Sequence, residues 1–257
     1  MVKSNKLLYR PKENPSAALR IICFSYAGGS ASVFHPWLNK LHIAAELVVC
    51  ELPGRGGRLG EPPYQNMDSM LNDLVDAILI YTDKPFILFG HSMGSKVAYE
   101  LMLLMRRKNL PEPVHFIASA ATAPYQTRTS RPISKLSDPL FAMALSRLGG
   151  IPPAILKNNE FLSILLPALR ADFNIVETYI NTSMEKILGN LTIMGGLNDL
   201  AITSDGLLSW TSLASKGSKV LWLDGGHFFI KEHTIQVVNL INRIVSDEHQ
   251  FINAIAV

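Results

Sequence analysis

The sequence predicts an α/β fold in which a mostly parallel central sheet is flanked by helices. Short apolar runs alternate with longer amphipathic stretches along most of the 257 residues, and this alternation is typical of βαβ units. A block without good strands, residues 132–188, interrupts the alternation. We therefore expect one hydrophobic core built from residues 1–131 and 189–257, with a helical insertion over residues 132–188.

Apolar runs of strand length, bounded by turn residues, predict the strands of this sheet. They cover residues 19–26, 45–52, 86–89, 114–120, 191–194 and 220–223. Apolar residues at helical spacing predict the helices. These cover residues 66–81, 95–107 and 234–245 in the core, and 138–148, 160–169 and 173–182 in the insertion. Asp68 or Ser69 is expected to cap the first helix.

The composition argues against several classes of partner. The 24 basic and 21 acidic residues leave a net charge of +3, too balanced to indicate nucleic acid or an anionic membrane as partner. The chain has no apolar run of about 18 residues, as a membrane span requires, and its polar N-terminus lacks the apolar core of a signal peptide. We expect a cytoplasmic monomer that needs no metal or organic cofactor.

The chain contains two cysteines. Cys23 and Cys50 each lie in an apolar run, without the spacing of a zinc site. We expect buried thiols on neighbouring strands rather than a disulfide, which suits a reducing compartment.

A G-x-S-x-G pentapeptide, residues 90–94, joins the predicted strand 86–89 to the helix that follows it. A sharp turn in this position lifts a serine hydroxyl above the sheet, and its glycines avoid a clash where strand and helix cross. The alternative is an ordinary βα turn with an incidental serine. The flanking strand and helix favour the first interpretation, with Ser92 as the nucleophile of an α/β-hydrolase fold.

A serine hydroxyl needs a base and an acid that orients the base, and in this fold the acid precedes the histidine in the chain. His227 follows the last predicted strand and is the expected base. Asp199 follows the predicted strand 191–194 and is the expected acid. The rival carboxylates fit other roles, because Asp205 resembles a helix N-cap and Asp224 a turn former.

An oxyanion hole requires two backbone N–H groups. Met93, the residue after the proposed nucleophile, is expected to supply one of them. The other is expected from the glycine-containing loop 26–29, which follows the first predicted strand. A plain βα turn is the alternative interpretation of this loop.

A series of longer segments gives information beyond the fold class. In chain order they are FSYAGGSASVFHPW (24–37), ELPGRGGRLGEP (51–62), GHSMGSKVAYEL (90–101), LSRLGGIPPAIL (145–156), LPALRADFNIVETY (166–179), MGGLNDLAI (194–202) and GGHFFI (225–230). With them the chain resembles the type II thioesterases that accompany nonribosomal peptide and polyketide synthetases. The combination is specific, above all LRADF within the helical insertion, which a generic hydrolase has no reason to carry.

The resemblance implies a Ser92, Asp199 and His227 triad with the Ala27 N–H as the first-loop oxyanion donor. It implies hydrolysis of stalled or wrong acyl groups from the phosphopantetheine arm of acyl or peptidyl carrier proteins, with the insertion as a lid. Leu200 stands where the family commonly has proline.

Two other functions remain open on the sequence. An oxygen-ester esterase or lipase, or an acyltransferase, uses the same fold and triad. A carrier-binding module without catalysis is the second alternative, which the intact order of Ser, Asp and His disfavours. Arg55, Arg58 and Lys96 are candidate contacts for an acidic carrier protein, with scattered solvated charges as the alternative interpretation.

Overall fold

The computed structural model describes residues 6–126, 131–150 and 158–255, and within them a seven-stranded sheet forms the centre of the molecule. The strand order is β1-β3-β2-β4-β5-β6-β7, and each neighbouring pair is parallel except the antiparallel pair β1 and β3. The strands are β1 Leu8–Tyr9, β2 Leu19–Phe24, β3 Ala45–Cys50, β4 Phe86–His91, β5 His115–Ser119, β6 Asn190–Gly196 and β7 Ser218–Leu223. The predicted sheet is confirmed, apart from β1, which is too short to leave a pattern in the sequence.

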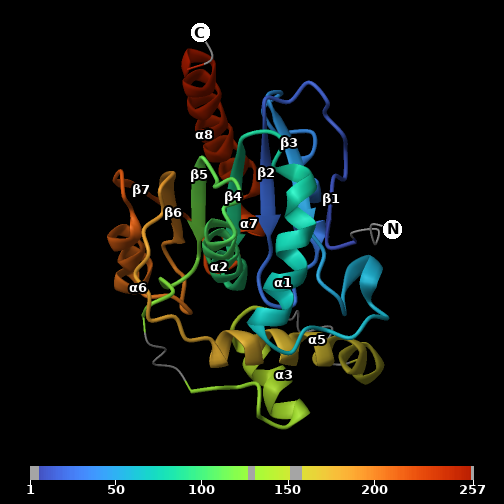
Figure 1. Ribbon diagram of the computed structural model, residues 1–257. Helices are drawn as coiled ribbons and strands as arrows, with labels where there is room; N and C mark the ends of the chain where they lie inside the picture. The colour runs from blue at the N-terminus through green and yellow to red at the C-terminus, as the bar shows by residue number, and fades with distance from the viewer. Residues whose placement is uncertain (1–5, 127–130, 151–157, 256–257) are drawn as a thin grey trace.

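Helices cover both faces of this sheet (Figure 1). On one face α1 (Met67–Ile78) and α2 (Met93–Arg107) pack against the sheet in an apolar cluster that includes Leu74, Val97 and Leu88. On the other face η1 (Ala31–Trp37) and α8 (Thr234–Ile255) form a second cluster around Trp37, Ile241 and Phe89. Side chains of alternate strand residues enter opposite clusters, as the pleat of a strand requires.

The two cysteines illustrate this alternation. Cys23 in β2 belongs to one cluster and Cys50 in β3 to the other, and both are buried free thiols. Their predicted placement on neighbouring strands is confirmed. Because they lie on opposite faces of the sheet, the fold itself keeps the two sulfur atoms from pairing.

Several helix boundaries differ from the prediction. The predicted segments 160–169 and 173–182 form one helix, α5 (Asn159–Thr178), which continues through Pro167. The cap of α1 is Asn66, whose extended backbone lets its side chain accept the N–H of Ser69, so the expectation of Asp68 or Ser69 was wrong. The C-terminal helix α8 continues to Ile255, beyond the predicted end.

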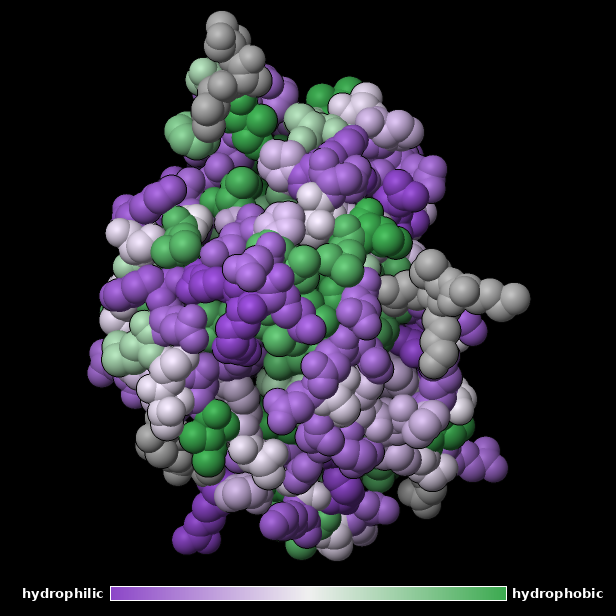
Figure 2. Space-filling view, viewed as in Figure 1, coloured by the Kyte–Doolittle hydropathy of each residue, from purple (hydrophilic) through white to green (hydrophobic). Residues whose placement is uncertain are grey.

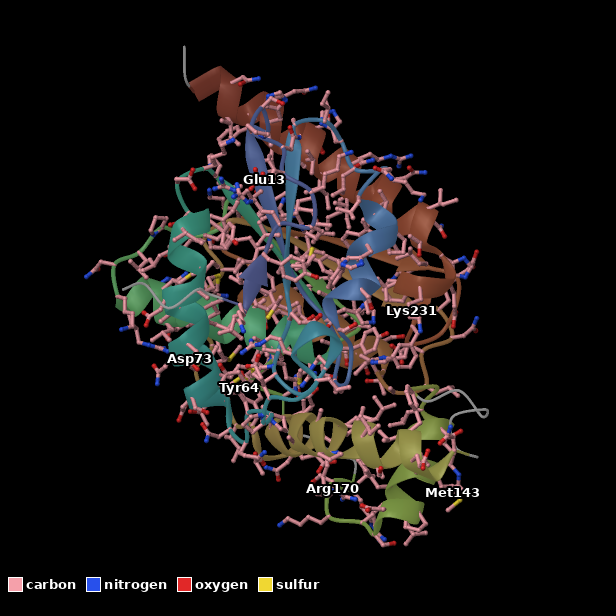
Figure 3. The ribbon with its side chains drawn as sticks, turned by 90° about the vertical axis from the view of Figure 1, so that its right-hand side faces the viewer. Glu13, Tyr64, Asp73, Met143, Arg170 and Lys231 are labelled. Carbon is pink, nitrogen blue, oxygen red and sulfur yellow. The ribbon has the colours of Figure 1, made fainter. Side chains whose placement is uncertain are left out.

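The helices α3 (Asp138–Arg147) and α5 lie between β5 and β6 in the chain and beyond one end of the sheet in space (Figure 1). They share a small apolar cluster around Phe141, Leu145 and Leu166. Figure 3 shows Arg170 of α5 and Met143 of α3 in this part of the molecule, away from Lys231. The bounds 132–188 of the insertion remain a prediction, and its residues 151–157 lie outside the described residues.

Polar residues cover most of the face seen in Figure 2, and apolar residues reach the surface near its middle. Among the helices of the described ranges, none combines the length and the apolar character that crossing a membrane requires.

Candidate active site

Ser92 occupies a strained turn between β4 and α2. Its φ is 55°, in the left-handed region that few side chains adopt. The turn is also tightly packed, because a Cβ on Gly90 would approach the Gly94 carbonyl oxygen to 2.3 Å, and one on Gly94 the Phe24 carbonyl oxygen to 2.2 Å. The pentapeptide therefore folds as the sharp corner that its glycines predict.

The three residues predicted as nucleophile, base and acid form one hydrogen-bonded chain. The Ser92 hydroxyl lies 2.9 Å from Nε2 of His227, and Nδ1 of His227 lies 2.8 Å from Oδ2 of Asp199. A carboxylate only accepts, so Nδ1 carries the proton and Nε2 is left to accept the serine proton. The Asp199 side chain is 3% exposed, and its other oxygen accepts the N–H groups of Ala201 and Ile202.

Backbone contacts hold the two loops that carry Asp199 and His227 side by side. The Leu197 N–H donates to the Leu223 carbonyl at 2.9 Å, and the Asn198 N–H donates to the Gly225 carbonyl at 3.0 Å. A Cβ on Gly196 would lie 2.5 Å from the Gly226 carbonyl oxygen. The glycine at the end of β6 thus permits the approach that brings acid and base together.

The predicted oxyanion donors, Ala27 and Met93, line the same cavity as Ser92. Within the described residues, neither N–H donates to a protein acceptor. The neighbouring Gly28 N–H is taken by the Asp172 carboxylate at 2.7 Å. Ala27, rather than Gly28, is therefore the N–H of this loop that is left for a ligand.

Neither of the rival carboxylates, Asp205 and Asp224, takes part in the hydrogen bonds that join Ser92, His227 and Asp199. Asp205 lies in the first turn of α6 (Ser204–Leu208), and the cap of that helix is Thr203, whose side chain accepts the N–H of Gly206. The prediction of Asp205 as the cap was wrong, because the residue with extended backbone before the helix is Thr203. Asp224 is exposed in the turn after β7.

His91, a weaker candidate for the base because it adjoins Ser92 in the chain, is a buried neighbour of the site. Its Nε2 lies 2.8 Å from the backbone carbonyl of His227, and its Nδ1 lies 2.9 Å from Oγ of Ser119. Because a carbonyl only accepts, Nε2 carries the proton and Nδ1 accepts from the Ser119 hydroxyl. Burial, with the nearby His227, lowers the pKa of His91 to about 3. A neutral imidazole therefore supports the backbone of the candidate base.

This burial has a consequence for stability against pH. Between pH 6.5 and about 3 the unfolded chain binds a proton at residue 91 and the folded protein does not. Acidification through this window therefore removes about 1.4 kcal/mol of unfolding free energy per pH unit. His91→Gln keeps an N–H donor and does not titrate. We expect its unfolding free energy to depend less steeply on pH between pH 6.5 and 4.5 than that of the unmodified protein. Urea unfolding at a series of pH values measures this, and parallel curves for the two proteins would contradict it.

The hydrogen-bonded chain opens on a cavity of about 690 Å³, within the size range of small-molecule sites. Apolar walls come from Leu145 of α3, from Leu148 at the end of that helix, and from Leu169, Phe173 and Val176 of α5. Within the described residues, no three His, Cys, Asp or Glu side chains gather as candidate metal ligands. The cavity therefore offers apolar surface beside a nucleophile.

The three cations considered for carrier contact have different surroundings. Arg55 is 5% exposed and forms an ion pair with Asp172, so its prediction as a surface contact was wrong. Arg58 pairs with Glu61 at 2.6 Å. Lys96 lines the cavity, with its ammonium 5.3 Å from the centroid of the Tyr179 ring.

The fold and the Ser92–His227–Asp199 arrangement define an α/β-hydrolase. A family model described as "Thioesterase domain" matches residues 19–245. The chain therefore belongs to the thioesterase family.

Individual relatives extend along nearly the whole chain. The gramicidin S biosynthesis protein GrsT of Aneurinibacillus migulanus is 32% identical over 92% of this chain and 93% of its own length. The medium-chain S-acyl fatty acid synthase thioesterase of Homo sapiens is 34% identical over 85% and 83%. The structure of RedJ, a thioesterase of the prodiginine pathway in Streptomyces coelicolor, matches with 30% identity and a TM-score of 0.82 over 91% and 93%. The similarity to thioesterases is thus present in both sequence and structure.

Proposed function

We propose that this thioesterase hydrolyses acyl groups from the phosphopantetheine arm of carrier proteins, as a housekeeping enzyme of a nonribosomal peptide or polyketide synthetase. The observation that carries the proposal is the Ser92–His227–Asp199 chain opening on a cavity with apolar walls. The names of GrsT and RedJ, which refer to gramicidin S biosynthesis and the prodiginine pathway, support the choice of partner.

In the first half-reaction the Ser92 oxygen attacks the thioester carbonyl carbon while its proton passes to Nε2 of His227. The carbonyl π electrons move onto oxygen, where the N–H groups of Ala27 and Met93 stabilise the negative charge. The carbon–sulfur bond then breaks, the thiol leaves with the proton from His227, and the acyl group remains on Ser92.

In the second half-reaction a water molecule gives its proton to His227 and attacks the acyl ester. Collapse of this intermediate breaks the bond to Ser92, which regains the proton, and releases a carboxylic acid. Asp199 holds His227 in the required tautomer and stabilises its charged form in both steps.

The proposal includes a monomeric protein in the cytoplasm. The buried free thiols Cys23 and Cys50 suit a reducing compartment. Carrier-protein domains with their phosphopantetheine arms are the proposed partners.

A matched pair of substrates tests this function. One acyl group is presented on the phosphopantetheine arm of a carrier protein, once as the thioester and once as the oxygen ester. We expect kcat/KM to favour the thioester by about tenfold or more, equivalent to about 1.4 kcal/mol of transition-state free energy. The kcat/KM values for acyl chains of increasing length then show how much of the apolar wall of the cavity the acyl group contacts.

The same assay separates the alternatives. A preference for the oxygen ester would indicate an esterase or lipase. Carrier binding without turnover, together with failure of a fluorophosphonate probe to label Ser92, would indicate a non-catalytic module.

A further inference from the structure

A buried carboxylate of helix α5 reaches the loop that carries the proposed oxyanion donor. Oδ2 of Asp172 accepts the Gly28 N–H at 2.7 Å. The same carboxylate is held by the Arg55 guanidinium through contacts of 2.5 and 2.9 Å. The two side chains are 5% and 3% exposed, so this ion pair is almost completely removed from water.

The loop that receives this contact is a β-turn, residues 26–29. The Gly29 N–H donates to the Tyr26 carbonyl at 2.8 Å, and Gly28 in the third position has a φ of +77°. Ala27 in the second position is not among the residues of positive φ, and this combination identifies a type II turn. Types I and II differ mainly by a flip of the central peptide, here the one joining Ala27 to Gly28, and glycine tolerates both.

The Asp172 carboxylate selects between these two forms. In the observed turn the Gly28 N–H points at the carboxylate. A flipped peptide would turn the Ala27 carbonyl oxygen toward a buried negative charge instead, which is unfavourable. The carboxylate thus fixes the peptide plane next to the Ala27 N–H.

Helix α5 meets the turn a second time through Leu169, one helical turn before Asp172. A Cβ on Gly28 would lie 2.2 Å from Cδ2 of Leu169, so the helix packs directly onto the turn. Both contacts depend on the position of α5, which also forms a wall of the cavity through Leu169 and Phe173.

From these contacts we propose that Asp172 is a positioning residue, which fixes the orientation of the Ala27–Gly28 peptide. The geometry of the oxyanion hole then depends on the position of α5 against the turn 26–29. This inference rests on the proposed role of the Ala27 N–H. The oxyanion hole is then complete when the helix that encloses the acyl group is in place, so binding and activation of the carbonyl are coupled.

A pair of double variants isolates the contact. Removing Asp172 alone leaves Arg55 buried without its partner, which is strongly destabilising. The variants R55M/D172N and R55M/D172L both lack the buried charges and have side chains of similar size. They differ in whether residue 172 offers an oxygen to the Gly28 N–H.

We expect the leucine variant to have a kcat about tenfold or more below that of the asparagine variant, at similar KM. The reason is that leucine cannot accept the Gly28 N–H, so the turn 26–29 is no longer held in the orientation that the oxyanion hole requires. Melting temperatures of the two variants verify that both are folded. Equal kcat values in two folded proteins would overturn the proposal. In that event, thioesterase activity of the unmodified protein would still stand, so failure here is distinct from failure of the proposed function.

Glu177→Gln is the matched control. Glu177 is a second carboxylate of α5 that accepts backbone N–H groups, from Ile133 at 2.7 Å and Ser134 at 3.1 Å. These contacts hold residues 133 and 134 rather than the turn 26–29, so we expect kcat to change little.

A measurement on the unmodified protein keeps the proposal testable even if the double variants do not fold. Amide hydrogen exchange followed by NMR gives the opening free energy of single N–H groups. We expect the Gly28 N–H to exchange with the same opening free energy as the amides of α5. Markedly faster exchange of Gly28 would show that the turn opens without the helix and would overturn the coupling.

Discussion

Replacing Ser92 with alanine is expected to lower kcat for an acyl-carrier thioester by about 10⁵-fold or more, since loss of a triad nucleophile in serine hydrolases has effects of this size. The hydroxyl is the atom that His227 contacts at 2.9 Å. Alanine keeps the Cβ, so the turn with its φ of 55° gains no new clash. The fold should therefore survive, and the melting temperature should stay close to that of the unmodified protein.

Steady-state hydrolysis and fluorophosphonate labelling measure this effect. Ser69→Ala is a suitable control, because Ser69 lies in α1, is exposed and bonds to Asn66. Turnover within tenfold of the unmodified protein in the folded Ser92→Ala variant would reject Ser92 as the nucleophile.

The second large effect is expected for Asp199→Asn, with a loss of about 10⁴-fold in kcat. Oδ1 of Asp199 accepts two backbone N–H groups, from Ala201 at 2.8 Å and Ile202 at 3.1 Å. In the variant these groups hold the amide oxygen and turn the amide nitrogen toward His227. An amide nitrogen donates, so Nδ1 of His227 becomes the acceptor and Nε2 takes the proton. The imidazole then cannot accept the proton of Ser92.

The rival carboxylate provides the control for this variant. Asp224→Asn changes a carboxylate three residues before His227 that is exposed in a turn, and we expect little change in kcat. Comparable losses in both variants would contradict the assignment of Asp199, as would an Asp199→Asn protein with near-normal turnover.

The parts of the site that the sequence predicted share a local signal. Ser92 lies in a pentapeptide between a strand and a helix, and Asp199 and His227 each follow a strand, so the order of strands and turns was enough to select them. Because parallel strands end at the same edge of the sheet, three loops that are distant in sequence meet there. The hydrogen-bonded chain found between them follows from this topology.

The remaining parts depend on contacts between segments that are distant in the chain, although Asp172 and Arg55 both lie in segments that carry the family resemblance. Asp172 and Arg55 are 117 residues apart in the chain, and neither segment alone shows that the two side chains form a pair. Two signals pointed to Asp172: it belongs to the segment LRADF, and it lies three residues after Leu169 and so on the apolar side of its helix. The sequence disfavours His91 as the base because it adjoins the nucleophile, and its supporting role could not be predicted because its partners, Ser119 and the His227 carbonyl, come from other strands and loops.

Helices α3 and α5 form one contiguous stretch of chain between β5 and β6, while the proposed reacting groups come from loops of the sheet. Evolution or an engineer can therefore alter acyl preference by exchanging this stretch and leave the chemistry in place. The Asp172–Arg55 pair sets a condition on such chimeras. A transplanted segment must supply a carboxylate that pairs with Arg55 and accepts the Gly28 N–H. Without it, the chimera has a new substrate-binding wall, but the turn 26–29 of its oxyanion hole is not held in place.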